Sequence, residues 1–358
     1  MNNIYSEYML SETVLQSVRN RRQLKYIKPS KEWDDLSSVL LQKIHLSNEY
    51  RVGVDTCATN IIHNLFTHYM YDINESIIIT TNSEHPSIFA QFNNSEYKGE
   101  RNNVSYDIIT YNSNAPKVYL FDIEDISTLD FISDAIQNTK NIFLYTKGCN
   151  SQTGKIYTDN YMDNIKKYIH KISPSVKILH CIDDVQSLFI INRDYNNYDY
   201  IISTAHAIIP PYDMGIIIYK DINNDFGYQI LPWLDDYIKK WGTIQEIIQK
   251  IYQIRNTIIQ EISSIAPKDM IISDGDDYNP NIINITIPKK YYIETLKDLK
   301  KPFLEKYGIK LEGYGFDMIH CPEMYIRVRC IELLVNIIPI GDVINRIKEV
   351  LQIFIQKV

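Results

Sequence analysis

Short runs of aliphatic and β-branched residues, separated by longer amphipathic segments, are the feature that most limits how this chain can fold. Several runs are continuously apolar, which is typical of strands buried on both faces of a sheet. Alternation of such strands with helices predicts a mostly parallel sheet covered by helices on both faces, an α/β fold. The strands are expected at 76–80, 106–110, 142–145, 177–181, 199–203 and 215–219, and the helices at 58–69, 129–138 and 160–172.

The last third of the chain has a different pattern. Apolar residues recur at helical spacing from 234 to 265, which predicts a long helix that leaves the sheet domain. A loop rich in Asp, Asn and Gly follows, and a smaller α+β domain is expected after it. Its elements are predicted as strands at 282–287 and 325–330 and helices at 291–307 and from Asp342 onward. We therefore divide the chain into a large domain, 1–250, and a small domain, 251–358.

Composition excludes several classes of protein. Of the 358 residues 45% are hydrophobic and 23% are charged, as in folded globular proteins. The net charge of −7, with scattered basic residues, argues against a nucleic-acid-binding protein. Five cysteines without regular spacing indicate a reducing compartment. The sequence has no signal-like N-terminus and no apolar run of about 18 to 20 residues, so we expect a cytoplasmic protein without membrane contact.

Polar residues follow several of the expected strands, at the edge where α/β sheets bind ligands. Ala58, Thr59 and Asn60 open a helix after the strand expected at 51–55. Free backbone amides at a helix N-terminus attract anions, so a phosphate would suit this position. The alternative interpretation is an ordinary helix cap.

Two further positions could serve a bound aromatic ligand. His85, after the strand at 76–80, could stack on such a ligand or protonate it, although a loop histidine is the simpler interpretation. Asp183 ends the strand that starts at 177, with Gln186 three residues later. A carboxylate in a cleft requires a cationic partner, such as a protonated ring nitrogen, whereas a surface aspartate requires none.

The remaining candidates follow other strands. Ser151 lies in a polar turn, 149–154, which by itself is only a loop. Thr204 and His206 follow the strand at 199–203 and offer groups to an anion; Ala207 comes next.

Taken in order, these segments resemble the class V aminotransferase family of pyridoxal-phosphate (PLP) enzymes, from about Val52 to the C-terminus. That family includes cysteine desulfurases, isopenicillin N epimerase-like proteins and kynureninase. The resemblance implies fold type I, a large domain with a mostly parallel seven-stranded sheet, and a homodimer with its site near the subunit interface. It also implies PLP as cofactor and an amino acid or related amine as substrate.

The resemblance assigns roles to individual residues. It predicts that the cofactor phosphate is bound by Ala58, Thr59, Asn60, Thr204 and His206, and that Thr243 of a neighbouring subunit also contacts it. It also predicts that His85 stacks on the cofactor ring, that Asp183 pairs with the ring nitrogen and that Gln186 contacts the ring hydroxyl. Ser151 lies in the matching turn and is expected to be a further cofactor-binding residue. Arg327 matches the arginine that holds the substrate carboxylate.

One position departs from the family. The Schiff-base lysine should directly follow His206, and the residue there is Ala207. Without that amine we expect the chain to be inactive or severely impaired in the family's chemistry. Either an engineered substitution removed the lysine, or the natural protein lacks it. Retention of the other site residues favours an active parent enzyme.

The alternative function is a non-catalytic binding or scaffold protein that keeps the fold. Within the enzymatic interpretation, desulfuration, transamination, epimerisation and elimination all stay open. Lys147 and Lys220 are the nearest lysines in motif order, and we expect both to be solvated surface residues. Cys321 is interpreted as a half-buried thiol at a strand edge. No metal-binding motif is present.

Overall fold

The computed structural model describes residues 30–55, 57–72, 76–89, 117–151, 153–188, 190–204, 214–220, 234–235, 238–239, 241–288, 290, 309–312, 324–335 and 338–356. The expected strand at 106–110 and the expected helix at 291–307 lie outside these residues. His206, Ala207 and Cys321 also lie outside them.

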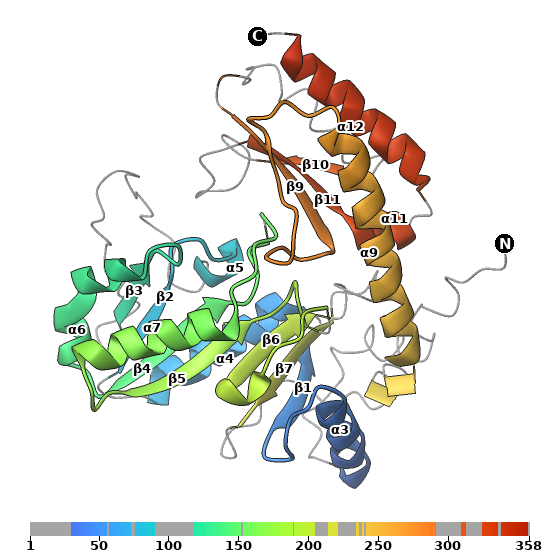
Figure 1. Ribbon diagram of the computed structural model, residues 1–358. Helices are drawn as coiled ribbons and strands as arrows, with labels where there is room; N and C mark the ends of the chain where they lie inside the picture. The colour runs from blue at the N-terminus through green and yellow to red at the C-terminus, as the bar shows by residue number, and fades with distance from the viewer. Residues whose placement is uncertain are drawn as a thin grey trace.

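A seven-stranded sheet forms the larger part of the molecule (Figure 1), with the strand order β1-β7-β6-β5-β4-β2-β3. Four of the six neighbouring pairs are parallel, and β7 runs antiparallel to β1 and to β6. This confirms the α/β fold with a mostly parallel sheet. The strands are β1 (Arg51–Asp55), β2 (Ser76–Thr81), β3 (Lys117–Phe121), β4 (Asn141–Lys147), β5 (Lys177–Asp183), β6 (Tyr200–Thr204) and β7 (Gly215–Tyr219).

Helices cover both faces of this sheet. α4 (Ala58–Asp72) packs on one face through Ile61 and Leu65, and α7 (Asp159–Ile172) packs on the other. Between β3 and β4 the chain forms a 3-10 helix, Ile126–Ile132, and a short helix α6, Ser133–Gln137. The single helix expected at 129–138 is therefore wrong, because Ser133 starts a new helix where the 3-10 turns end.

A second, antiparallel sheet has the order β10-β11-β9-β8. The helix α9 (Trp241–Ser263) runs from the first sheet to the second (Figure 1). The predicted domain division at residue 250 falls inside α9 and stays a prediction. The other elements here are β8 (Ile271–Ile272), β9 (Ile282–Ile287), β10 (Ile309–Glu312), β11 (Met324–Arg329), α11 (Cys330–Val335) and α12 (Ile340–Ile355).

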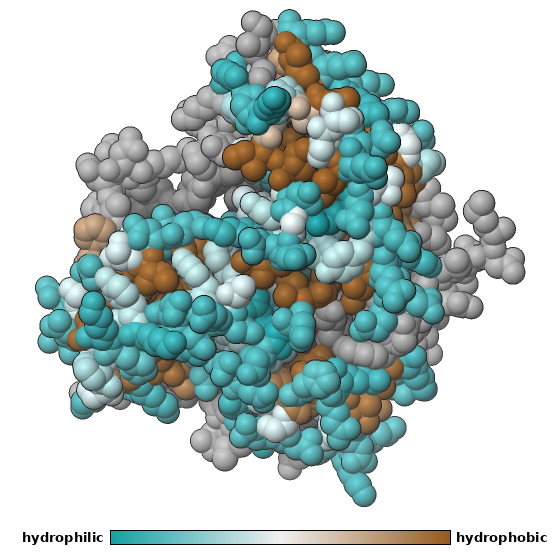
Figure 2. Space-filling view, in the orientation of Figure 1, coloured by the Kyte–Doolittle hydropathy of each residue, from teal (hydrophilic) through white to brown (hydrophobic). Residues whose placement is uncertain are grey.

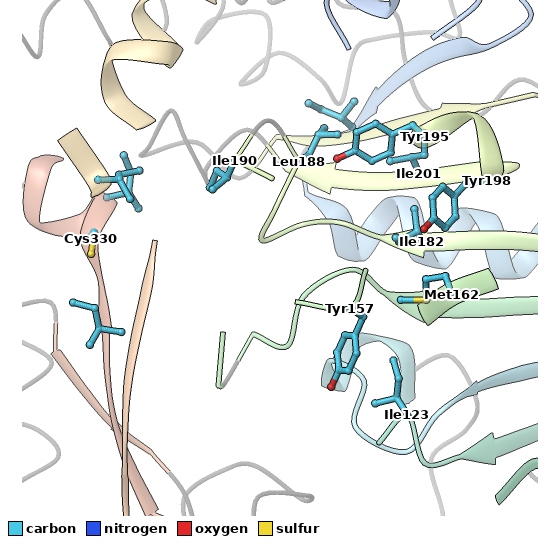
Figure 3. Close-up of a cluster of buried hydrophobic side chains, with 14 of the residues drawn as sticks. Ile123, Tyr157, Met162, Ile182, Leu188, Ile190, Tyr195, Tyr198, Ile201 and Cys330 are labelled. Atoms are coloured by element: carbon cyan, nitrogen blue, oxygen red, sulfur yellow. The ribbon is translucent and has the colours of Figure 1, made fainter. Parts of the chain in front are cut away.

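One hydrophobic cluster extends through both sheets. Figure 3 shows Ile182 and Ile201 of the large sheet at one end of the view and Cys330 of α11 at the other, with Ile190 between them. An extra helix, α3 (Lys31–Lys43), joins this cluster through Trp33, whose indole N–H donates to the carbonyl of Val52. Because these side chains exclude water together, the two sheets are held as one packed body.

The face in Figure 2 is mostly hydrophilic, with hydrophobic side chains in small separate areas. Among the helices that the structure describes, none is long and apolar enough to cross a membrane.

Candidate functional site

Polar residues form a row along the edge where the parallel strands end. Asp55 and Thr204 both pair in register with Gly215, and Asp183 pairs in register with Lys147 on β4. Neighbouring strands are about 4.8 Å apart, so residues in register are direct neighbours along this edge. Asp183 pairs in register with Ile202 on β6, two residues before Thr204, so these two predicted site residues lie along the same edge.

Asp183 is buried, with 9% of its surface exposed. Its Oδ2 accepts a hydrogen bond from the Tyr145 hydroxyl at 2.9 Å, and its Oδ1 accepts one from the Val185 N–H at 3.1 Å. Burial raises the pKa of Asp183, which these hydrogen bonds partly oppose. It forms no ion pair with a lysine or arginine in the described part of the chain, so a cationic ligand group would relieve the cost of its charge.

His85 lies in the turn before the short helix α5 (Pro86–Phe89), and it stays exposed. Its Nδ1 accepts a hydrogen bond from the Ser87 N–H at 3.2 Å, which leaves Nε2 as the protonated nitrogen. Partial desolvation by the surrounding protein lowers the pKa of His85, the charge of Asp183 raises it and the charge of Arg327 lowers it. Asp183 and Arg327 therefore lie within electrostatic range of His85.

Thr204 ends β6 with only 4% of its surface exposed. Its hydroxyl is buried and makes no hydrogen bond in the structure described here. Next to it, Gly215 contacts the start of α4, where an added Cβ would come within 2.6 Å of the Cys57 backbone and 2.7 Å of the Ala58 nitrogen. An unsatisfied hydroxyl and a helix N-terminus thus lie side by side, a combination that suits an anion.

Because backbone atoms of Cys57 and Ala58 occupy the space of a Cβ, we expect Gly215→Ala to lower the free energy of unfolding by about 1 to 3 kcal/mol. Gly341→Ala is the matched control, since nothing lies within 4 Å of its Cβ position. That change on α12 should leave stability equal or raise it by up to about 1 kcal/mol. Urea unfolding of both variants checks this, and equal effects would contradict the close approach at Gly215.

The other predicted phosphate residues lie at the first turn of α4. The side chain of Thr59 is exposed. The Asn60 and Asn64 amides each lie 3.4 Å from a different oxygen of Asp55, which is only 2% exposed. Asn60 therefore supports the turn from β1 into α4, and its role as a phosphate ligand stays a prediction.

Hydrogen bonds connect the loops of Ser151 and Gln186 to the part of the chain that forms the smaller sheet. Arg327 on β11 donates a hydrogen bond from Nη1 to the Ser151 carbonyl. The Asn279 amide donates to the Gln186 carbonyl at 2.7 Å and lies 3.6 Å from the Cys149 sulfur. Backbone contacts thus hold both predicted loops against the smaller sheet.

Thr243 lies in the first turn of α9, but the structure does not describe its side chain. His206 and Ala207 lie outside the described residues. The roles expected of these three residues stay predictions. The described residues contain no group of three histidine, cysteine, aspartate or glutamate side chains that could hold a metal ion.

The expectation that Lys147 is a solvated surface residue is wrong. Lys147 is only 5% exposed, and its Nζ donates hydrogen bonds to the Ser83 hydroxyl, at 2.7 Å, and to the Ser83 carbonyl. Sequence reasoning also missed Tyr145, which lies on the same face of β4 two residues earlier. The sequence did contain a signal for both residues, because they lie near the end of a buried strand that neighbours the strand of Asp183.

Glu84 is a second buried charge beside this edge. It is 5% exposed, and its Oε1 accepts a hydrogen bond from the Thr81 hydroxyl at 2.6 Å. Burial raises the pKa of Glu84 to about 7, against the opposing charge of Lys147 and the Thr81 hydrogen bond.

This raised pKa predicts a pH dependence. Between about pH 5 and pH 7 the folded chain holds a proton on Glu84 that the unfolded chain has released, so this group lowers stability as pH rises. The free energy of unfolding of Glu84→Gln, relative to the unsubstituted chain, should increase by roughly 2 to 3 kcal/mol from pH 5 to pH 8. Urea unfolding at several pH values measures it, and parallel curves for the two proteins would contradict it.

No family model matches the sequence, and no curated protein matches it. Solved structures do. The chain shares their fold. A NifS-like protein from Rickettsia africae superposes with a TM-score of 0.63 at 12% identity, over 96% of this chain and 98% of that one. The histidinol-phosphate aminotransferase of Clostridium acetobutylicum gives 0.60 at 13% identity, over 95% of each chain.

A third similar structure is a lysine-to-alanine variant of serine palmitoyltransferase from S. paucimobilis, which holds PLP as an aldimine with myriocin. It gives a TM-score of 0.58 at 10% identity, over 96% of this chain and 86% of that one. These likenesses support the predicted fold type I architecture, with its seven-stranded sheet and helices on both faces.

Proposed function

We propose that this chain binds pyridoxal 5'-phosphate along the row of polar residues at the edge of the seven-stranded sheet. The observation that carries the proposal is the buried carboxylate of Asp183, which has hydrogen bonds but no ion pair among the described residues. A protonated pyridine nitrogen supplies the missing positive charge. The solved structures with this fold include one that holds bound PLP, which is consistent with the proposal.

The described residues fit such a ligand. The orphan hydroxyl of Thr204 and the N-terminus of α4 suit its phosphate. His85 lies close enough to the charges of Asp183 and Arg327 to face the same ligand, with its lowered pKa favouring the neutral ring. PLP, when bound, supplies an electron-withdrawing ring that stabilises negative charge on the carbon bearing the substrate amine.

In this proposal each residue has a defined task. Asp183 keeps the ring nitrogen protonated, and Tyr145 orients the carboxylate through its hydrogen bond. Arg327, on β11 of the smaller sheet, has a guanidinium group that suits a substrate carboxylate. Its contact with the Ser151 carbonyl would hold it in place before the substrate arrives.

We further propose that the chain is a cytoplasmic, homodimeric member of the class V aminotransferase family that acts on an amino acid or a related amine. The ordered set of motifs supports this. Because Ala207 stands where the family has its lysine, the chain as it stands should be severely impaired. A non-catalytic binding protein is the second candidate function, and the same alanine favours it.

Equilibrium dialysis with PLP tests the proposal. We expect the chain to bind about one PLP per subunit, and Ala207→Lys to turn yellow on incubation with it. Inorganic phosphate should compete, because it shares the anion site. Absence of PLP binding by both forms would contradict the proposal, and binding without any activity in Ala207→Lys would favour the second candidate.

A further inference from the structure

Lys147 is a buried amine at the edge where we propose that PLP binds. Its Nζ donates to the two Ser83 oxygens, which are neutral acceptors, and in the described part of the chain it forms no ion pair. A buried ammonium group without an ionic partner is costly, whereas a neutral amine in the same place is not. The surroundings therefore favour an amine that can give up its proton.

The position of Lys147 relative to the ring-binding carboxylate is set by the sheet. Lys147 and Asp183 are register partners on neighbouring parallel strands, so their side chains leave the sheet on the same face about 5 Å apart at the Cα atoms. Tyr145, two residues before Lys147, points to that face and reaches Asp183 with its hydroxyl. The four-carbon stem of a lysine is flexible, so Nζ can exchange Ser83 for a ligand group beside Asp183.

A second buried ionisable group, Glu84, directly follows Ser83, whose oxygens accept from the amine. Burial lowers the pKa of Lys147, and the charges of Glu84, Cys149, Glu124 and Asp183 act in the opposite direction. Burial raises the pKa of Glu84 to about 7. Burial therefore favours the neutral form of both groups, and a lysine amine without its proton is a nucleophile.

We propose that Lys147 is the amine through which this chain attaches an aldehyde ligand covalently, with PLP as the aldehyde. The inference rests on the proposed function. The Nζ lone pair attacks the aldehyde carbon and forms the C–N bond. Both remaining amine protons leave with the carbonyl oxygen as water, and a C=N bond results. The step needs no oxidant or reductant.

Reductive trapping tests the inference directly. The full chain is incubated with PLP near its dissociation constant, reduced with borohydride, digested and examined by mass spectrometry. We expect the reduced pyridoxyl group on the peptide that contains Lys147. In Lys147→Met and Lys147→Arg the label should fall about tenfold or more, because neither side chain can form the imine. Lys220→Met is the matched control, since that side chain is 33% exposed and is held by surface groups.

The outcomes separate this inference from the proposed function. PLP that binds in dialysis but labels other lysines equally in Lys147→Met would overturn the inference and leave the proposed function intact. No binding in dialysis would overturn both. Lys147→Arg keeps the positive charge, and its urea midpoint shows whether it is folded, so lost labelling in a folded Lys147→Arg protein supports the covalent role.

Discussion

Asp183→Asn is expected to weaken PLP binding by about 100-fold, because it removes the buried negative charge that we propose pairs with the ring nitrogen. Asparagine has almost the same shape; its single carbonyl oxygen can still accept from the Val185 N–H, and its amide NH2 can donate to the hydroxyl oxygen of Tyr145. Burial already raises the pKa of the aspartate. A neutral residue should therefore leave the free energy of unfolding equal or higher while binding falls.

Equilibrium dialysis and urea unfolding measure the two effects separately. Asp163→Asn on α7 is the matched control, because that aspartate forms a partly exposed ion pair with Lys166. It should change stability by less than about 1 kcal/mol and leave PLP binding unchanged. If Asp183→Asn bound PLP as tightly as the control, the carboxylate would have no part in holding the cofactor.

Arg193→Met is expected to lower the free energy of unfolding by about 3 to 5 kcal/mol, the largest stability effect that we predict. Arg193 lies beneath the site with its side chain 1% exposed. Its Nη1 donates to Asp159 at 2.9 Å and to the Tyr157 carbonyl at 3.0 Å, and its Nη2 donates to the Gly148 carbonyl at 3.1 Å. It also lies 3.7 Å from the fully buried carboxylate of Asp184.

Methionine cannot replace these contacts, so Asp184 would stay buried with only its hydroxyl partners, Ser187 and Tyr195. The same loss removes one of the two hydrogen bonds at the Gly148 carbonyl, just after β4, and leaves the one from the Tyr157 N–H. Urea unfolding checks the change. Arg346→Met is the control, since that arginine pairs with Glu349 at the surface and should cost less than about 1 kcal/mol. If both variants lost the same free energy of unfolding, the buried contacts of Arg193 would contribute no more stability than a surface ion pair.

The strand assignments show where sequence patterns are sufficient. β7 and β9 begin and end at the predicted residues, and β4 and β5 extend the predicted strands by a few residues. These strands lie inside their sheets, so a continuous apolar run is required of them whatever surrounds them. β3, at the edge of the large sheet, was not predicted, although residues 118–121 form a short apolar run.

The carboxyl-edge residues show the complementary limit. The sequence by itself determined that Asp183 and Thr204 end buried strands, since each follows a run that can only be core. Only the tertiary structure decided that Lys147 is buried, that its amine contacts Ser83, and that the Asn60 amide faces Asp55. The physical reason is that a side chain's exposure and partners depend on groups far away in the sequence, such as Ser83, which packing alone brings to the end of β4.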